Sequence, residues 1–300
     1  MTWLSDSTVS RLRDVADWPD FAATKYELLE KAGLGGMASV YIAQDKDLDR
    51  RVAVKVIHTP VADPEIQQRM LAEARIIARL EHPGILPIHD MGSLPDGRVF
   101  YVMKLVHGLR LDRFMDKTPL LPDRLSVFLK ICDAVAFAHS QGVIHRDLKP
   151  ANVMIGDFGE VLVIDWGLAK APGAETLESV VMGTPGYMAP EQEHGSTNTV
   201  DQRADVYSLG ILLRSLLPAG GPNSLRAVAG KASAASPDGR YSTVLELAQE
   251  ISRFLNGERV TAFPERLSQT AIRLVARHRT FVFLIATYLA VRLVLLLAAR

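Results

Sequence analysis

The sequence lacks the features of secreted, disulfide-bonded or nucleic-acid-binding proteins. Its 300 residues contain one cysteine, Cys132, so no intrachain disulfide can form and a reducing compartment is expected. Cys132 lies in an apolar stretch of helical periodicity, which favours a buried structural thiol over a nucleophile. The 34 basic and 34 acidic residues balance, which leaves no excess of positive charge for nucleic acid. Residues 1–18 contain no apolar run, so no secretory signal is expected.

One long apolar run is present near the other end of the chain. Residues 280–299 carry a single charge, that of Arg292. A helix of this length extends about 30 Å, the thickness of a hydrocarbon core, and its apolar residues contribute roughly −4 to −7 kcal/mol to insertion against about +3 for the arginine. The run therefore predicts a transmembrane helix, with a helix packed on the body or lying flat on a bilayer as alternatives. Arg273, Arg277 and Arg279 precede it, which places the N-terminal body in the cytoplasm by the positive-inside rule.

The rest of the chain changes its pattern twice. Residues 1–24 form a polar leader, in which Trp3 and Trp18 either dock onto the body or mark a mobile tail. Residues 26–103 alternate strand patterns with one helical pattern, and after Gly108 the patterns become mostly helical with two short strands. The sequence therefore predicts an α+β fold of two lobes.

Two patterns in the first lobe suit the binding of phosphate groups. The stretch GLGGMASV, residues 33–40, lies between two predicted strands, and glycines allow a backbone to approach a triphosphate closely. This signal is weak alone, because tight hairpins also use glycine. Lys55 follows on the strand VAVK at a spacing that suits a ligand of the α- and β-phosphates, and Glu73 on the predicted helix can orient its ammonium group.

The stretch HRDLKPAN, residues 145–152, is the most specific pattern in the chain. Asp147 can accept a hydroxyl proton and hold a nucleophile in line with its target. Lys149 can neutralise a phosphoryl group during transfer, and Asn152 can bind a metal ion. These three residues predict the catalytic centre of a phosphotransferase.

Residues 26–259 resemble the eukaryotic-type protein serine/threonine kinases, particularly those of bacteria. The resemblance rests on seven stretches in family order, GLGGMASV, VAVK, LAEARIIARLEHPGIL, HRDLKPAN, IDWGLAK, GTPGYMAPEQ and DQRADVYSLG. It implies a bilobal kinase fold and catalytic roles for Asp147, Lys149, Lys55 and Glu73.

The same resemblance implies a nucleotide site. Met103 corresponds to the gatekeeper, Lys104–Val106 to the segment that meets adenine, and Ala53 and Met154 to the residues above and below the base. The implied ATP-binding residues are Gly33, Leu34, Gly35, Gly36, Met37, Ala38, Ser39, Val40, Ala53, Lys55, Met103, Lys104, Val106 and Met154. Outside this site, Glu191 is expected to pair with Arg240, and Asp205 to support the backbone of the catalytic stretch.

Two Asp–aromatic–Gly triplets compete for the second metal position, Asp157-Phe158-Gly159 and Asp165-Trp166-Gly167. In protein kinases the magnesium-binding aspartate follows a β-hairpin that begins just after the catalytic asparagine. Asp157 is five residues beyond Asn152, too few for both strands, whereas Asp165 is thirteen beyond it and follows the apolar strand VLVI. Asn152 and Asp165 are therefore the predicted metal ligands, and Asp157 is predicted to be a turn residue.

The chain departs from the family pattern at three places. Ala38 replaces the third glycine of the phosphate loop, and Trp166 replaces the usual phenylalanine. Between Gly210 and Arg240, the stretch SLRAVAGKASAASPDG leaves little room for the extra helix and substrate-docking surface that family members place there. The last departure concerns peptide docking and not ATP binding.

The segment from Asp165 to Glu191 corresponds to the activation segment. Arg146 is the residue that grips a phosphate on this segment in regulated kinases, and Thr176 and Ser179 are the candidate phosphosites. An ordinary solvated loop is the alternative for both. Thr184 is expected to contact Asp147 rather than to carry a phosphate.

These patterns together predict a leader over residues 1–24, a kinase domain over 25–259, a basic linker over 260–279 and a transmembrane helix over 280–299. The kinase domain divides into lobes of about 25–103 and 107–259. We expect a single-pass kinase of the inner or plasma membrane that transfers the γ-phosphoryl group of ATP to Ser or Thr hydroxyls of proteins.

The expected cofactors are ATP and Mg²⁺, with Mn²⁺ as a substitute for the latter. The expected partners are protein substrates, the membrane and a second copy of the chain that is phosphorylated in trans. The alternative is a membrane-tethered pseudokinase that binds nucleotide and serves as a scaffold.

Overall fold

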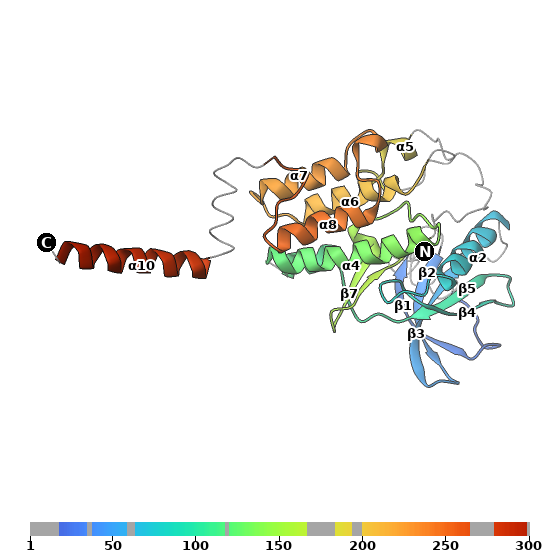
Figure 1. Ribbon diagram of the computed structural model, residues 1–300. Helices are drawn as coiled ribbons and strands as arrows, with labels where there is room; N and C mark the ends of the chain where they lie inside the picture. Colours follow the sequence, from blue (N-terminus) through green and yellow to red (C-terminus); the bar gives the residue numbers. More distant parts are fainter. Residues whose placement is uncertain are drawn as a thin grey trace, which may run out of the picture.

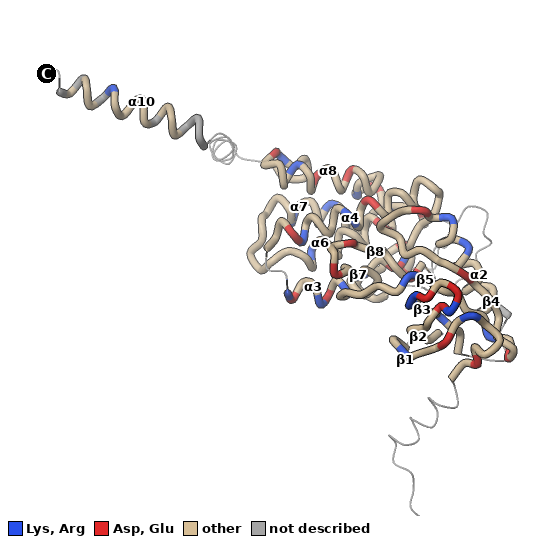
Figure 2. Tube along the Cα trace, turned by 90° about the horizontal axis from the view of Figure 1, so that it is seen from below, with Lys and Arg blue, Asp and Glu red and all other residues tan. Residues whose placement is uncertain are grey.

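The computed structural model describes residues 18–34, 38–58, 64–117, 120–166, 184–193, 200–264 and 279–298. Figure 1 shows a body of two lobes, with a sheet and helix α2 at one end and a group of helices at the other. The last helix, α10, extends away from this body in both views (Figures 1 and 2). The two lobes confirm the fold predicted for the body of the chain.

The first lobe is built on an antiparallel sheet of five strands in the order β1-β2-β3-β5-β4. Its strands are β1 (Tyr26–Leu34), β2 (Ala38–Asp45), β3 (Arg50–Ile57), β4 (Ile88–Ser93) and β5 (Val99–Lys104). The pairing of β3 with β5 sets Ala53 opposite Met103 and Lys55 opposite Tyr101. Strands β1, β2 and β3 match the strands predicted on either side of GLGGMASV and at VAVK, whereas β4, an edge strand with no fully buried residue, was not predicted.

Both faces of this sheet are covered. Helix α2 (Pro64–Ala78) begins at the proline that the sequence placed near its start, and it packs against β4 and β5. On the other face the segment before β1 buries Phe21, whose ring centroid lies 4.8 Å from that of Phe100. Trp18 makes an edge contact with Tyr41 at 5.2 Å, so this part of the leader docks on the body.

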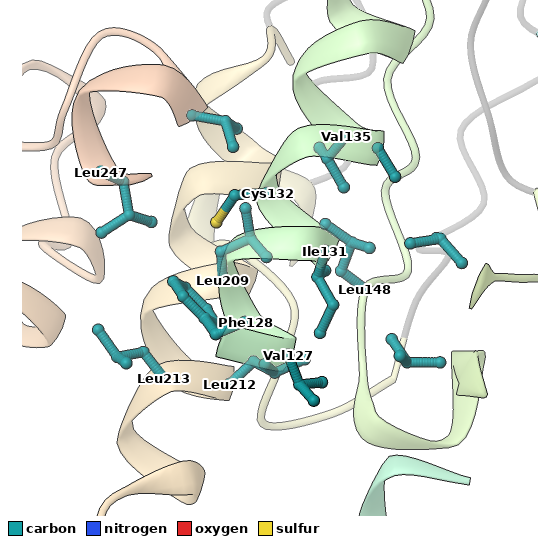
Figure 3. Close-up of a cluster of buried hydrophobic side chains, with 14 of the residues drawn as sticks. Val127, Phe128, Ile131, Cys132, Val135, Leu148, Leu209, Leu212, Leu213 and Leu247 are labelled. Carbon is teal, nitrogen blue, oxygen red and sulfur yellow. The ribbon is translucent and has the colours of Figure 1, made fainter. Parts of the chain in front are cut away.

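The second lobe is a group of packed helices. Helix α4 (Leu121–Ser140) contacts α6 (Arg203–Leu216) and α8 (Val244–Leu255), and Figure 3 shows their side chains interleaved around Phe128. Cys132 lies inside this core and forms no disulfide, and burial raises the pKa of its thiol. The prediction of a structural thiol is confirmed. The shorter helices of the lobe are α3 (Leu111–Lys117), α5 (Pro190–Glu193) and α7 (Asn223–Ala232), with 3₁₀ turns η1 (Pro150–Asn152) and η2 (Pro237–Gly239).

A small sheet lies where the two lobes meet. Its antiparallel strands are β6 (Gly108–Arg110), β7 (Val153–Gly156) and β8 (Val161–Val163), in that order. The last two strands form the hairpin predicted after Asn152. This hairpin leads the chain from η1 to Asp165.

Helix α7 fills the stretch after α6, in which the sequence leaves little room for the extra helix of family members. It packs closely on α6, because a Cβ on Gly210 would lie only 2.8 Å from the Cβ of Ala232. The connection between the two helices, residues 217–222, is too short for another helix. The region therefore holds one helix, in contact with the core.

Helix α10 (Arg279–Ala298) occupies the predicted transmembrane run. Within the described residues, however, no helix combines the length and the apolar character needed to cross a bilayer. The prediction of a spanning helix over residues 280–299 is therefore not confirmed.

Candidate active site

A cleft between the first lobe and the small sheet is lined by Lys55, Asn152 and Asp165, three of the residues predicted to carry chemistry. Its walls come from β1, β2, β3, α2 and β5 on one side and from β6, η1 and the residues after β8 on the other. The residues that line it are Gly33, Leu34, Ala38, Val40, Lys55, Ile77, Leu86, Ile88, Tyr101, Met103, Arg110, Ala151, Asn152, Ile164, Asp165 and Trp166.

Lys55 lies between two carboxylates in this cleft. Its ammonium group donates to Glu73 Oε1 at 2.8 Å and to Asp165 Oδ1 at 3.3 Å. Burial alone would lower the pKa of Lys55, but the nearby carboxylates of Glu73 and Asp165 raise it above its ordinary value. Burial alone would raise the pKa of Asp165, but Lys55 holds it below its usual range. Both groups are therefore charged at neutral pH.

Asp147 is held by three neighbours. Lys149 Nζ donates to Oδ2 at 2.7 Å, Asn152 Nδ2 donates to the same oxygen at 3.1 Å, and the Thr184 hydroxyl donates to Oδ1 at 2.9 Å. Lys149 also donates to the Thr184 hydroxyl at 2.6 Å. These hydrogen bonds fix the position of the carboxylate. A fixed position is required of a group that receives a proton from a defined direction. The predicted contact between Thr184 and Asp147 is confirmed.

The backbone beneath Asp147 is supported by a buried carboxylate on α6. Asp205 accepts hydrogen bonds from the amides of His145 and Arg146, each at 2.8 Å, and it contacts His139 Nε2 at 2.7 Å. Burial opposes ionisation of Asp205, but His139 and these donors hold its pKa below the usual value. Arg146 has a φ of 68°, an uncommon backbone conformation for a residue with a Cβ. The role expected for Asp205 is confirmed.

The two competing aspartates lie in different places. Asp165 opens into the cleft beside Lys55, whereas Asp157 lies on the exposed turn between β7 and β8. In that turn the amide of Gly159 donates to the Gly156 carbonyl oxygen at 2.9 Å, and Gly159 has a φ of 80°. Of the two, Asp165 is the one positioned to meet a ligand in the cleft.

The cleft offers oxygen ligands of the kind that Mg²⁺ prefers. Asn152 uses its amide nitrogen to donate to the Asp147 carbonyl oxygen at 2.9 Å, which leaves its amide oxygen for another partner. The side chain of Asp165 is 48% exposed and supplies carboxylate oxygens. No cluster of three or more metal-binding side chains occurs in the described part of the chain. Two oxygen ligands nevertheless fit Mg²⁺, which usually completes its shell with water and substrate phosphates.

Eight of the predicted nucleotide or metal residues line the cleft, and others do not. Gly35, Gly36 and Met37 lie outside the described residues, as do the candidate phosphosites Thr176 and Ser179. The side chain of Ser39 bonds His58 Nε2 at 2.8 Å and does not line the cleft. Neither do Ala53, Lys104, Val106 and Met154.

Part of the apolar wall of the cleft and two polar residues within it, Tyr101 and Arg110, were not predicted from the sequence. The missed residues are Ile77, Leu86, Ile88, Tyr101, Arg110, Ala151 and Ile164. Alternation along a strand could have identified Tyr101, because it lies two residues before Met103 and so shares its face of β5. No comparable signal marks Leu86 or Ile164, which lie outside regular elements.

Comparison with known proteins fits this geometry. The model of the protein kinase domain matches residues 26–277, which cover most of the chain. The chain belongs to the protein kinase family. Among curated proteins, the kinase resembles the serine/threonine-protein kinase PknD of Protochlamydia amoebophila, with 38% identity over 226 residues. It also resembles the serine/threonine-protein kinase PknB of Mycobacterium tuberculosis, with 37% identity over 279 residues. The chain therefore belongs to the bacterial serine/threonine branch of this family.

The kinase covers only part of these relatives. The match spans 64% of this chain and 23% of PknD, and 80% of this chain and 44% of PknB. Among solved structures, the kinase domain of Mycobacterium tuberculosis PknI aligns with a TM-score of 0.58 and 28% identity, covering 77% of this chain and 96% of that domain. Membership in the family implies the use of ATP and Mg²⁺.

Trp166, the residue that follows Asp165, is buried. The indole is 1% exposed, and its ring lies 4.5 Å from the His145 ring, centroid to centroid. Its Nε1 donates to the Val163 carbonyl oxygen at 3.4 Å. The larger aromatic is therefore part of the core behind the cleft. The predicted pair of Glu191 and Arg240 also forms, with two hydrogen bonds of 2.6 and 2.7 Å.

Proposed function

We propose that this protein transfers the γ-phosphoryl group of ATP to Ser or Thr hydroxyls of proteins. The observation that carries the proposal is the placement of Asp147 among Lys149, Asn152 and Thr184, beside a cleft lined by Asp165 and by Lys55, which Glu73 holds. No charged group required for phosphoryl transfer is replaced in this set. A structural core would not require so many ionised side chains at one opening.

In this proposal each residue has a separate task. Lys55, oriented by Glu73, binds phosphate oxygens of the nucleotide, and the apolar wall of the cleft receives the base. Asp147 accepts the proton of the attacking hydroxyl and aligns its oxygen, while Lys149 balances the charge that develops during transfer. Asn152 and Asp165 hold Mg²⁺, which neutralises phosphate charge when bound. Positioning and electrostatics carry the reaction, without a covalent intermediate on the enzyme.

A transfer assay on the full chain tests this function against its alternative. We expect radiolabel from γ-labelled ATP and Mg²⁺ to enter a generic protein substrate, and acid hydrolysis to recover it as phosphoserine or phosphothreonine. Nucleotide binding is measured on the same preparation by calorimetry. A protein that binds ATP and incorporates no label would instead be the pseudokinase scaffold.

We also propose that the protein phosphorylates its own activation segment at Thr176 or Ser179. Arg146 supports this, because its Nε and Nη2 atoms are buried and have no hydrogen-bond partner in the described structure. Burial lowers the pKa of this guanidinium, partly offset by Asp205, so an anion would relieve the cost of its charge. Peptide mapping of the labelled protein from the transfer assay locates the phosphate.

Membrane attachment through α10 is a further part of the proposal. The exposed apolar side chains of this helix lie all around its axis and include Phe283, Leu284, Ile285, Tyr288, Leu289, Val291, Val294, Leu295 and Leu297. The helix contains no acidic residue, and its basic residues are Arg279 at its start and Arg292. Such a surface is unfavourable in water and is stabilised by lipid. On a membrane the proposed kinase body faces the cytoplasm, where two copies meet for phosphorylation in trans.

A flotation experiment with vesicles of phosphatidylcholine and phosphatidylglycerol tests the attachment. We expect the full chain to float with the vesicles and the double variant Leu289→Arg, Leu295→Arg to lose at least about a hundredfold in partitioning, since each arginine costs about 3 kcal/mol in apolar lipid. The control is Leu48→Arg on the kinase body, where the native side chain is 61% exposed. Equal flotation of all three proteins would contradict attachment through α10.

A further inference from the structure

The pair formed by Lys55 and Glu73 has a third member, Tyr101. Glu73 Oε1 accepts a hydrogen bond from Lys55 Nζ at 2.8 Å and another from the Tyr101 hydroxyl at 2.9 Å. The Lys55 ammonium also lies 5.5 Å from the centroid of the Tyr101 ring. Tyr101 and Glu73 are both buried, with 3% and 6% of their surfaces exposed. One carboxylate oxygen thus joins the lysine and the tyrosine away from solvent.

This oxygen is the meeting point of three elements. Lys55 lies on β3 directly opposite Tyr101 on β5, and Glu73 projects from α2. The Tyr101 ring belongs to the apolar cluster that contains Met70 and Ala74, which flank Glu73 on the helix. The ring therefore packs against α2, and the hydroxyl bonds the carboxylate that α2 carries.

The two donors differ in how firmly they hold Glu73. Lys55 has a long flexible stem and a second carboxylate, Asp165, within reach at 3.3 Å. Tyr101 is fixed by its strand and its packed ring, with only the hydroxyl left to rotate. Burial and the nearby Glu73 raise the pKa of Tyr101, so the hydroxyl remains protonated and donates throughout the neutral range. A buried carboxylate held by a fixed donor keeps one orientation.

We propose that Tyr101 is a positioning residue that fixes Glu73, and through it Lys55, for the alignment of the nucleotide phosphates. This proposal rests on the proposed kinase function. The hydroxyl links α2 to the sheet at the point where the lysine is oriented, so the lysine is already aligned before nucleotide enters. With an apolar residue at this position of β5, the Glu73 carboxylate would keep only its contact with Lys55.

Tyr101→Phe tests the proposal, because it removes one oxygen and retains the ring. Since the substitution leaves the apolar wall that receives the adenine base untouched, we expect kcat to fall about tenfold with a change of less than threefold in KM for ATP. If Tyr101 acts through Glu73, the double variant with Glu73→Gln should lose no more activity than Glu73→Gln alone. Multiplied losses in the double variant would mean that Tyr101 acts only on general stability.

The chain provides a matched control in Tyr26→Phe. The Tyr26 hydroxyl donates to Asp90 Oδ2 at 2.8 Å, and its side chain is likewise buried, but it belongs to the cluster on the opposite face of the sheet. This variant loses the same type of hydrogen bond without touching Glu73. We expect its kcat to remain within twofold of the unmodified protein.

A phosphorus NMR measurement separates this proposal from the proposed activity. The imido analogue of ATP is bound with Mg²⁺ to each protein, and the resonances of its phosphates are compared. We expect them to shift in Tyr101→Phe and to stay in place in Tyr26→Phe. Unchanged resonances and unchanged kcat in Tyr101→Phe would overturn the proposal. If the protein binds the analogue but transfers no phosphate, the activity fails and the resonances still decide the role of Tyr101.

Discussion

Replacing Asp165 with alanine is expected to lower the rate of phosphoryl transfer by about a thousandfold, equivalent to about 4 kcal/mol of transition-state stabilisation. The variant removes Asp165, the only acidic residue among those that line the described cleft, whereas the buried Glu73 contacts Lys55 from α2. It therefore removes the carboxylate oxygens available to Mg²⁺ and leaves Asn152 as the remaining ligand. Transfer rates under saturating ATP and Mg²⁺ measure the loss.

Asp157→Ala is the matched control for this prediction. Asp157 is an exposed turn residue, although its triplet with Phe158 and Gly159 spells the more familiar family motif. We expect the control to retain transfer within twofold, because surface substitutions of this kind rarely change stability by more than about 0.5 kcal/mol. Should Asp157→Ala abolish transfer while Asp165→Ala does not, the assignment of the metal position would be reversed.

The second large effect is expected from Asp147→Asn. An amide cannot accept the proton of the attacking hydroxyl, and general-base catalysis contributes about 10²–10⁴ to rate, so kcat should fall by about a thousandfold. Asparagine keeps the size of the side chain, its oxygen can accept from Lys149 and its amide nitrogen can donate to the Thr184 hydroxyl, so the fold should persist. Single-turnover transfer with the full chain gives the rate.

Nucleotide affinity provides the internal control for Asp147→Asn. Asp147 does not line the nucleotide cleft, so the dissociation constant for ATP with Mg²⁺ should change by less than twofold. Wild-type rates of transfer in this variant would falsify the enzymatic role of Asp147 and favour the scaffold alternative. A large loss of binding would instead indicate a disturbed cleft.

Much of the site could be predicted because its residues are close in sequence and their order is diagnostic. Protein kinases place a β-hairpin between the catalytic asparagine and the magnesium-binding aspartate, and counting from Asn152 against this pattern separates Asp165 from Asp157. Glu73 was found because one helix had to face the strand of Lys55. The charged groups on predicted elements therefore indicated the position of the cleft from the sequence.

The features that the sequence did not reveal depend on contacts between distant segments. Tyr101 on an apolar strand resembles an ordinary core aromatic, and only the packing of α2 on β5 brings Glu73 to its hydroxyl. Helix α7 was missed because its close approach to α6 depends on Gly210 meeting Ala232 across the lobe. The predicted span at α10 was based on the apolar composition of residues 280–299, and the described structure does not confirm it.

The docked segment before β1 determines where this domain can be cut. The family match begins at residue 26, yet Phe21 is only 5% exposed and packs with Phe100 on the outer face of the sheet. A recombinant fragment that starts at the family boundary would discard Phe21 and leave Tyr41 and Phe100 uncovered. Such an aromatic surface favours self-association in solution. The smallest fragment suited to expression and crystallisation therefore starts at or before Trp18, upstream of the boundary that homology suggests.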